Sequence, residues 1–308
     1  MKPLVIATLL LLAGPSAARA QQPPDLDSLL EGGRQWLEEK VDTNVLQQLP
    51  ELDEAQAERL LRRIDEALRG EEVLDLGRLR GMGKALLPWV EQDETLRPFA
   101  PWLRSRLDYL EASEQLNRLV PPAPKPTREL PAPKRSAPTE DQQKRVWARV
   151  VATEPAPAAA RKLLPRLKSA FVAEGVPAEL VWVAEVESSF DPKARSPAGA
   201  AGLFQLMPET ARGLGLSTFP IDQRYDPDQS AAGAAKLLKR LRVRFRDWPL
   251  ALAAYNAGEG RVGGLLTRHK ATRFQEIARF LPAETQMYVP KIDAVLHRRE
   301  GKGLDGVR

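Results

Sequence analysis

The chain has 308 residues, 43% hydrophobic and 28% charged, a composition typical of a globular protein with one large domain or two smaller ones. It has no cysteine, which excludes disulfides, thiolate nucleophiles, iron–sulfur clusters and cysteine zinc sites. The two histidines, His269 and His297, lie far apart among basic and polar residues, so we interpret both as surface residues. We therefore expect neither a metal site nor another cofactor.

The first 20 residues, MKPLVIATLLLLAGPSAARA, have the features of a secretory signal peptide. A lysine precedes an apolar segment at residues 4–13, and the final Ala-Arg-Ala fits a small-residue cleavage site. The apolar segment has about half of the ~20 residues that a membrane-spanning helix requires, which argues against an uncleaved anchor. Without cysteine there is no site for a lipid after cleavage. We predict an exported protein of the periplasm or cell envelope, with no stable membrane anchor.

Residues 21–120 are rich in leucine, glutamate and arginine at helical spacing. In the stretch QAERLLRRIDEALRG, leucine and isoleucine recur at three- and four-residue steps, and Gly70 is expected to end the helix. No cluster of catalytic or ligand-binding residue types stands out here. We predict a helical module whose role the sequence does not indicate.

Residues 121–140 are predicted to be a Pro-rich linker. Seven prolines lie between Pro121 and Pro138. Proline fixes φ and lacks a backbone donor, which favours an extended conformation, and the segment has almost no large apolar side chain to bury.

The charge of the chain changes sign across this segment. Residues 21–120 hold 13 basic and 21 acidic side chains, a net charge of −8, whereas residues 141–308 hold 27 and 18, a net charge of +9. The basic part suits an anionic polymer or an envelope surface, and could equally attract the acidic module. Export and the absence of a basic stripe with interleaved aromatics argue against nucleic acid.

Helical patterns also dominate residues 141–308. We predict a helix that starts at Pro177 and is stopped by Asp191-Pro192, and later helices at residues 208–213, 229–245, 249–257 and 284–298. Little alternation with period two is present, so any strands are short. The fold class is therefore mainly α.

The stretch VWVAEVESSF, residues 181–190, places two glutamates in an apolar segment. On a helical wheel Glu187 shares a face with small and aliphatic residues, and Glu185 projects about 160° away. Burial disfavours the ionised form, so an enclosed glutamate has a raised pKa and can serve as a general acid. A glutamate paired with arginine is an equally good interpretation, and helical spacing alone does not choose between Glu185 and Glu187.

Four motifs follow one another over about 110 residues. They are Glu-Ser at 187–188, Ser-Pro-Ala-Gly-Ala at 196–200 with Gly-Leu-Phe-Gln at 202–205, Ala-Tyr-Asn-Ala-Gly at 254–258, and LPAETQMYVPKI at 281–292. Together they resemble the lytic transglycosylases of the Slt type. The resemblance covers the second domain only, and implies that residues 141–308 form a lysozyme-like, α-rich α+β catalytic domain without cofactor.

By this resemblance Glu187, rather than Glu185, is the catalytic residue. It would cleave the β-1,4 bond between N-acetylmuramic acid and N-acetylglucosamine in peptidoglycan glycan strands without water, leaving 1,6-anhydro ends. One glutamate then suffices where glycosidases ordinarily need two carboxylates, because the substrate supplies the final nucleophile. We expect Ser196 and Gln205 to contact the sugar, Tyr255 to orient Glu187 through its hydroxyl, Asn256 to support the sugar, and Tyr288 to complete the cleft wall. Met207 is a further candidate for the cleft lining.

Phe204 stands where methionine is common in the family, and we interpret it as a core residue. Two other functions stay open: a hydrolytic muramidase that uses the same acid, and a non-catalytic glycan-binding envelope protein with the same fold. The acidic module could also inhibit the domain. No protein partner is indicated.

Overall fold

The computed structural model describes residues 53–122 and 135–307, which belong to one compact unit. The predicted signal peptide, the start of the helical module and most of the Pro-rich segment lie outside the described residues. The α-helices are α2 (Glu54–Arg69), α3 (Arg80–Gln92), α4 (Ala100–Leu119), α5 (Glu140–Ala152), α6 (Ala158–Ala173), α7 (Val183–Ser188), α8 (Pro208–Gly213), α9 (Pro227–Phe245), α10 (Trp248–Ala257), α11 (Glu259–His269), α12 (Phe274–Ile277) and α13 (Ala283–Glu300). Short 3-10 helices occupy Val73–Leu79, Arg97–Phe99, Ala178–Trp182, Gln223–Tyr225, Ala278–Phe280 and Leu304–Gly306.

The predicted mainly α fold class is confirmed. Within the described ranges, β structure is limited to two isolated bridges, Arg195 with Ala201 and Ala201 with Leu206. None of the described helices is long and apolar enough to cross a membrane.

Helix α2 forms as its sequence predicts. Asp53 and Gln56 make a capping box at its start, and Gly70 is its C-terminal cap. Leu61, Ile64 and Leu68 of the predicted apolar face are buried. The regular spacing of these residues therefore produces one buried stripe along the helix.

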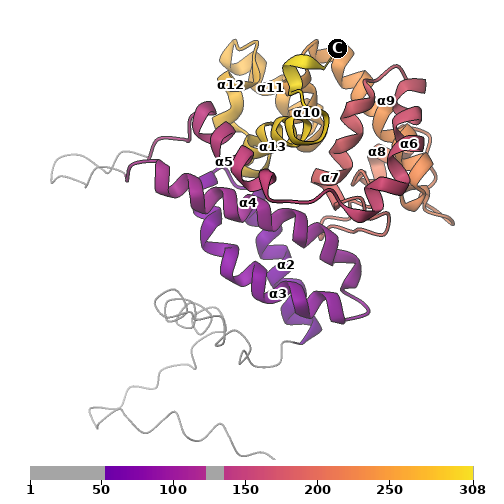
Figure 1. Cartoon of the computed structure of the whole chain (residues 1–308), viewed down its shortest axis with the longest axis horizontal. Coiled ribbons are helices and arrows are strands. Elements are labelled where there is room, and N and C mark those ends of the chain that lie inside the picture. Colours follow the sequence, from indigo (N-terminus) through magenta and orange to yellow (C-terminus); the bar gives the residue numbers. More distant parts are fainter. Residues whose placement is uncertain (1–52, 123–134, 308) are drawn as a thin grey trace, which may run out of the picture. The chain divides into compact units, whose positions relative to one another are not determined.

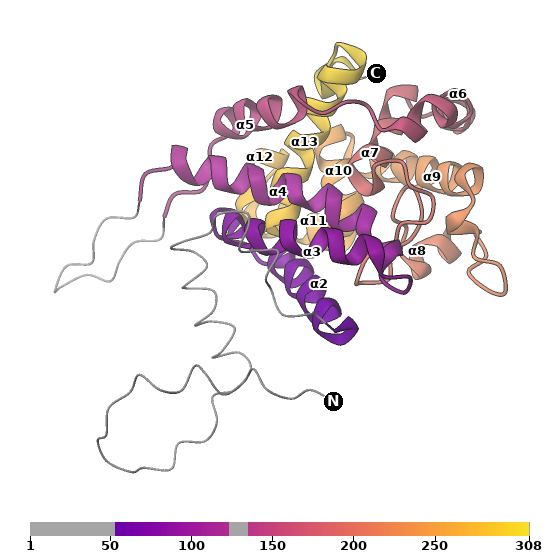
Figure 2. The same cartoon turned by 60° about the horizontal axis from the view of Figure 1, so that its bottom comes forward.

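The N-terminal helices α2 to α4 pack directly on the rest of the compact unit (Figure 1). The buried apolar side chains of both regions form one continuous cluster. Gln286 at the start of α13 donates to the carbonyl of Glu71 (2.8 Å), and the amide of Arg195 donates to the carbonyl of Pro98 (2.8 Å). Figure 2 shows α4 running across α13 and beside α5. These contacts join residues 53–120 to residues 141–307. The division into domains at residues 121–140 stays a prediction.

The described ends of the Pro-rich segment lie close together. The Arg135 guanidinium donates to the carbonyl of Pro121 (2.9 Å) and to the carbonyl of Asn117 (2.7 Å). Gln142, in the first turn of α5, donates to the carbonyl of Leu119 (3.2 Å). The chain therefore leaves α4 and returns beside its C-terminal end, where Arg135 and Gln142 donate to the last carbonyls of the helix.

The four later helices form where the sequence predicts them, with small changes at their ends. Helix α8 has the predicted bounds. Helix α9 begins two residues early because Asp226 caps it and Pro227 takes the first helical position. Asp247 caps α10 in the same way. Local start signals thus fix these boundaries.

The predicted continuous helix from Pro177 is wrong in part. Pro177 is the residue before the first turn, Ala178–Trp182 is a 3-10 helix, and α7 has only six residues. Ser189 and Phe190 both have left-handed backbones (φ 53° and 60°), so the chain leaves the helix before Asp191-Pro192. The tighter winding of the first turn makes a single 100° wheel a poor guide to this segment.

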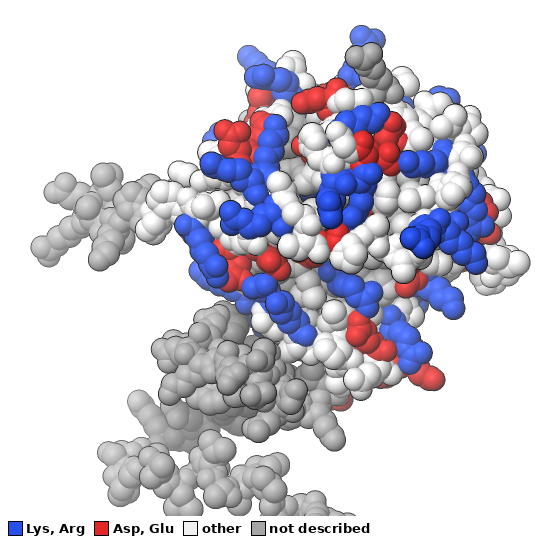
Figure 3. Space-filling model, in the orientation of Figure 1, with Lys and Arg blue, Asp and Glu red and all other residues white. Residues whose placement is uncertain are grey.

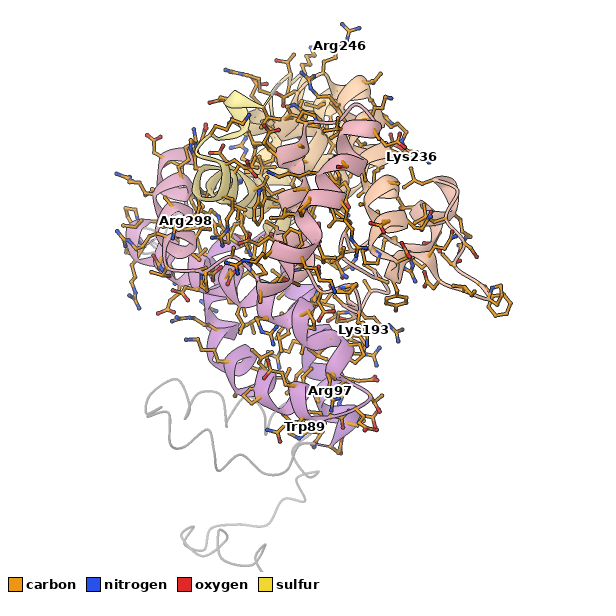
Figure 4. All side chains as sticks on the ribbon, turned by 45° about the vertical axis from the view of Figure 1, so that its right-hand side comes forward. Trp89, Arg97, Lys193, Lys236, Arg246 and Arg298 are labelled. Carbon is orange, nitrogen blue, oxygen red and sulfur yellow. The ribbon has the colours of Figure 1, made fainter. Side chains whose placement is uncertain are left out.

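The surface carries charges of both signs (Figure 3). Residues 229–246 of α9 and its C-terminal cap hold six basic and no acidic side chains. Lys236 and Arg246 from this segment lie on the outside of the molecule in Figure 4. Part of the positive charge of the C-terminal half is thus collected along one helix.

Candidate active site

Glu187 lies in the last turn of α7 and is only 4% exposed. Its burial follows from the local sequence, because every residue of α7 is buried and the flanking Trp182 and Phe190 rings meet edge to face (centroids 5.5 Å apart). The side chain that was expected to be an enclosed carboxyl group is therefore enclosed.

A tyrosine hydroxyl holds the Glu187 carboxyl group. Tyr288 Oη donates to Glu187 Oε1 at 2.6 Å, and the Tyr288 side chain is fully buried. The Tyr255 hydroxyl, which was expected to orient Glu187, donates instead to the carbonyl of Phe204 (2.7 Å). Tyr288 is likewise a support beneath the carboxyl group rather than an exposed wall. Helix α13 brings Tyr288 across from a position 101 residues away.

The pKa of Glu187 is raised to about 7. Burial is the main cause, and the nearby Glu284 carboxylate raises the pKa further. The Arg106 guanidinium and the hydrogen bond from Tyr288 act in the opposite direction and lower it. Near neutral pH the carboxyl group can therefore both give up and take back a proton.

Glu185 is the glutamate that pairs with arginine. Arg299 of α13 binds its carboxylate with two nitrogens, at 2.7 and 3.0 Å, and both side chains are buried. Arg299 also donates to the carbonyl of Glu154 (3.2 Å). The two possibilities that the helical wheel left open are thus both realised, an arginine-paired glutamate at 185 and a protonatable one at 187.

The loop after α7 is tied to the end of that helix. Ser188 Oγ donates to the carbonyl of Leu203 (2.8 Å), which ties α7 to the Gly-Leu-Phe-Gln motif. Ser196 Oγ accepts from the amide of Ala200 (3.0 Å), and Ser196 is buried. Phe204 is fully buried, as predicted for a core residue.

Gln205 stabilises the same loop. Its Nε2 donates to the carbonyls of Gly202 (3.0 Å) and Ala194 (3.2 Å), so its donors serve the protein. Its Oε1 is buried and has no partner among the described residues, which leaves an acceptor for a ligand donor. Gln205 also has a left-handed backbone (φ 46°), a conformation that concentrates at functional sites.

Arg224 is a further support that the sequence did not single out. Its Nη1 donates to the carbonyls of Gly199 (2.8 Å) and Leu206 (2.9 Å), and Asp222 pairs with the same guanidinium (2.7 Å). The carbonyl of Arg224 lies only 1.8 Å from the place where a Cβ on Gly202 would be. With φ at +79°, position 202 therefore requires glycine.

The Ala-Tyr-Asn-Ala-Gly motif places Asn256 beside α13. Asn256 Nδ2 donates to Glu284 Oε1 (3.3 Å), and the Thr285 hydroxyl donates to Asn256 Oδ1 (2.5 Å). Met207 is 37% exposed, and Tyr255 and Asn256 are partly exposed. Among the predicted site residues, these three are the ones that are not buried.

Two charged residues at the site were missed by sequence reasoning. Glu284 lies within the motif LPAETQMYVPKI, and its place in that motif could have marked it as a site residue. Arg106 lies on α4 and approaches Glu187 Oε2 to 3.6 Å. No local pattern marks Arg106, because its partners on α7 and α13 are 80 or more residues away in the chain.

One cavity does not include Glu187. A cavity of about 150 Å³ lies between α5, α12 and α13, and Glu187 is not among its lining residues. The described residues contain no group of three or more His, Cys, Asp and Glu placed to hold a metal ion. His269 and His297 are exposed, as predicted.

The fold and site define a helical domain in which one buried, protonatable glutamate is held by a tyrosine. Residues 169–278 match the family model described as Transglycosylase SLT domain. The chain thus carries a domain of the transglycosylase SLT family, which confirms the resemblance found in the motifs.

Curated relatives match part of the chain. Membrane-bound lytic murein transglycosylase D of Escherichia coli (strain K12) is 42% identical over 139 residues, which are 43% of this chain and 30% of that protein. The transglycosylase of Enterobacteria phage PRD1 is 42% identical over 82 residues, 27% of this chain and 29% of that protein. Membrane-bound lytic murein transglycosylase F of Serratia proteamaculans is 35% identical over 127 residues, 37% and 24% respectively. The chain spans less than a third of the length of these relatives.

Solved structures with detectable likeness include the soluble lytic transglycosylase SLT70 of Escherichia coli, at 21% identity and a TM-score of 0.42, covering 92% of this chain and 46% of that one. An inactive mutant of the lytic transglycosylase Slt of Pseudomonas aeruginosa has 18% identity and a TM-score of 0.42, covering 80% and 44%.

Proposed function

We propose that this chain is a peptidoglycan lytic transglycosylase that cleaves the MurNAc-β-1,4-GlcNAc bond and forms 1,6-anhydro-MurNAc ends. The observation that carries the proposal is Glu187, a carboxyl group on a short buried helix with a pKa of about 7 and a tyrosine hydroxyl at 2.6 Å. The match to the transglycosylase SLT domain supports the same chemistry.

Glu187 acts first as an acid and then as a base. In its protonated form it gives its proton to the glycosidic oxygen, and the bond from that oxygen to the muramyl C1 breaks. The N-acetyl group of the sugar stabilises the positive charge at C1. The Glu187 carboxylate then takes the proton of the muramyl C6 hydroxyl, and the oxygen of that hydroxyl bonds to C1. Glu187 is protonated again, and no water is consumed.

A single carboxyl group with a pKa near neutrality suits this sequence of steps. An acid with a much lower pKa would be ionised before it could act, and one with a much higher pKa would be a weak acid. The neighbouring carboxylate, Glu284, accepts from Arg106 (2.7 Å) and Asn256 (3.3 Å) through Oε1, so this oxygen is engaged by the protein.

We assign the sugar contacts to the side chains that are accessible or unpaired. Met207, Tyr255 and Asn256 offer partly exposed surface, and Gln205 offers its unpaired Oε1 to an N–H or O–H donor of the glycan. Ser196 shapes the loop through its bond to Ala200. We further propose that the chain is exported to the periplasm, where peptidoglycan is found, on the basis of its first 20 residues.

Analysis of digested peptidoglycan by mass spectrometry tests the function. We expect muropeptides that are lighter than the hydrolysis products by one water molecule. Reducing muramyl ends alone would instead identify a hydrolytic muramidase. Glu187→Gln is expected to lower the rate by about 10²–10⁴-fold, the usual contribution of a positioned general acid. An unchanged function in this variant would identify a non-catalytic glycan-binding protein.

Glu209→Gln is the matched control. Glu209 is an exposed glutamate on α8 that pairs with Arg212 (3.2 Å) on the surface. Its replacement removes the same charge without touching the site, so digestion should proceed at the wild-type rate.

A further inference from the structure

Arg106 is a buried arginine that the N-terminal helices bring to the candidate active site. It lies on α4, is 5% exposed, and reaches two segments of the C-terminal half. Its Nη1 donates to the carbonyls of Glu187 (3.1 Å) and Val186 (3.3 Å) and to Ser105 Oγ (2.9 Å). Its Nη2 donates to Glu284 Oε1 (2.7 Å) and lies 3.6 Å from Glu187 Oε2. One planar guanidinium thus connects α7 to α13.

The contacts with α7 compensate for the shortness of that helix. The last carbonyls of a helix have no donor within the helix, and a buried carbonyl without a partner is costly. A cation at this end also interacts favourably with the helix dipole. Arg106 therefore holds the backbone of the turn that carries Glu187 and restricts where its carboxyl group can point.

The same guanidinium is the cation that faces the two carboxyl groups. Its charge is secure, because the pKa of Arg106 is raised by Glu284 and Glu187 despite its burial. The Trp102 and Tyr109 rings lie against it, with centroids 5.8 and 5.9 Å away. The titratable and charged groups facing Glu187 are Arg106 and Tyr109 from α4, Tyr255 from α10, and Glu284 and Tyr288 from α13.

We propose that Arg106 is a positioning residue for the transglycosylase reaction, and that the helical module supplies it as a structural part of the active site. The inference rests on the proposed function for the identity of the reaction. After Glu187 has given its proton to the glycosidic oxygen, its carboxylate is buried. The guanidinium at 3.6 Å stabilises that anion until it takes the proton of the sugar hydroxyl.

The test compares Arg106→Gln and Arg106→Lys with wild type and with Arg104→Gln. Arg104 lies on the same helix but is exposed and pairs with Glu91 on the surface, so it controls for the loss of one positive charge from α4. Each variant is assayed for kcat and KM on purified peptidoglycan across the pH range, and its folding is checked by thermal unfolding. The Glu187 carboxyl group is also titrated by carbon-13 NMR, with Glu187→Gln identifying its resonance.

For Arg106→Gln we expect kcat to fall about tenfold or more with KM nearly unchanged, because a hydrogen-bonded charge is lost from the reacting group. The loss of activity at high pH, where Glu187 ionises, should move upward by about one pH unit or more, as should the NMR titration. Arg106→Lys keeps the charge but loses the planar guanidinium with its several donors, so we expect a lower kcat with the wild-type pH limits. Arg104→Gln should match wild type.

A folded Arg106→Gln protein with wild-type kcat and an unmoved Glu187 titration would overturn the proposal. If that variant does not fold, Arg106→Lys decides, and a wild-type kcat there would count against the positioning role. A loss of rate in Arg106→Gln without movement of its pH limit would show that Arg106 serves folding only. The NMR titration needs no turnover, so a failure of the proposed activity in wild type remains distinguishable from a failure of this inference.

Discussion

Replacing Glu187 by glutamine should make the protein more stable, and increasingly so as the pH rises. The pKa of this buried carboxyl group is about 7 in the folded chain, against an ordinary value of 4.5. Below pH 4.5 both folded and unfolded chains hold the proton. Between 4.5 and 7 the unfolded chain releases it while the folded chain keeps it, so the wild type loses stability as the pH rises. The shift corresponds to about 3 kcal/mol of the free energy of unfolding, and the wild type has lost this amount in full above pH 7.

Urea unfolding followed by tryptophan fluorescence, at several pH values from 4.5 to 8, measures this effect. The free energy of unfolding of Glu187→Gln minus that of wild type should increase by about 3 kcal/mol across the range, mostly between pH 5 and 7. Glu209→Gln removes an exposed carboxyl group and controls for the charge itself. A difference that stays constant with pH, or decreases, would refute the reasoning that burial raises the Glu187 pKa.

Three further substitutions separate the roles around this group. Tyr288→Phe removes the 2.6 Å hydrogen bond that lowers the Glu187 pKa, so the high-pH limit of activity should move upward by about one to two units; an unmoved limit in a pH–rate profile would contradict the assignment. Gly202→Ala places a Cβ against the backbone of Arg224, and we expect several kcal/mol of destabilisation, measurable by thermal unfolding. Glu185→Gln leaves its buried arginine without a carboxylate and should cost about 3 kcal/mol of stability while the shape of the pH–rate profile is retained.

Glu187 could be proposed as the acid from the sequence because the evidence for it is local. Glu187 and Ser188 are adjacent, and the loop that Ser188 binds carries the next motif only 15 residues away. Glu185 could not be separated from Glu187 by helical spacing, because every residue of α7 is buried and neither glutamate lies on an exposed side. The motifs, rather than the periodicity, made the distinction that the structure supports.

The tyrosines show the limit of motif reasoning. Both Tyr255 and Tyr288 were placed at the site, but the motif positions do not state which hydroxyl points at Glu187. That choice depends on how α10 and α13 pack, and the structure gives the bond to Tyr288. Residue types near a site can be predicted from spacing, whereas the direction of a hydroxyl follows from tertiary packing.

Arg106 could not be predicted for a deeper reason. It lies in a helix with net acidic surroundings, and its partners are reached only through packing between distant segments. A buried arginine has no sequence signature that distinguishes it from the exposed Arg104 two positions earlier.

The net charges of the two halves suggested that an acidic module could attract or inhibit a basic domain. The buried ion pairs between the halves instead have their cation on either half. Arg106 of the acidic half binds Glu187 and Glu284 of the basic half, and Lys291 of the basic half binds Asp108 of the acidic half (2.6 Å). Net charge describes the solvated surface and carries little information about which buried groups meet.

These contacts change how the helical module should be understood. Inhibition by carboxylates of the module would place them against Glu187, but the charged side chain that residues 53–120 bring there is a cation, Arg106. A cation stabilises the carboxylate that must form when the proton is given away, and so supports catalysis rather than opposing it. The module and the transglycosylase SLT domain therefore depend on each other: the domain supplies the acid, and the module holds the turn on which the acid sits.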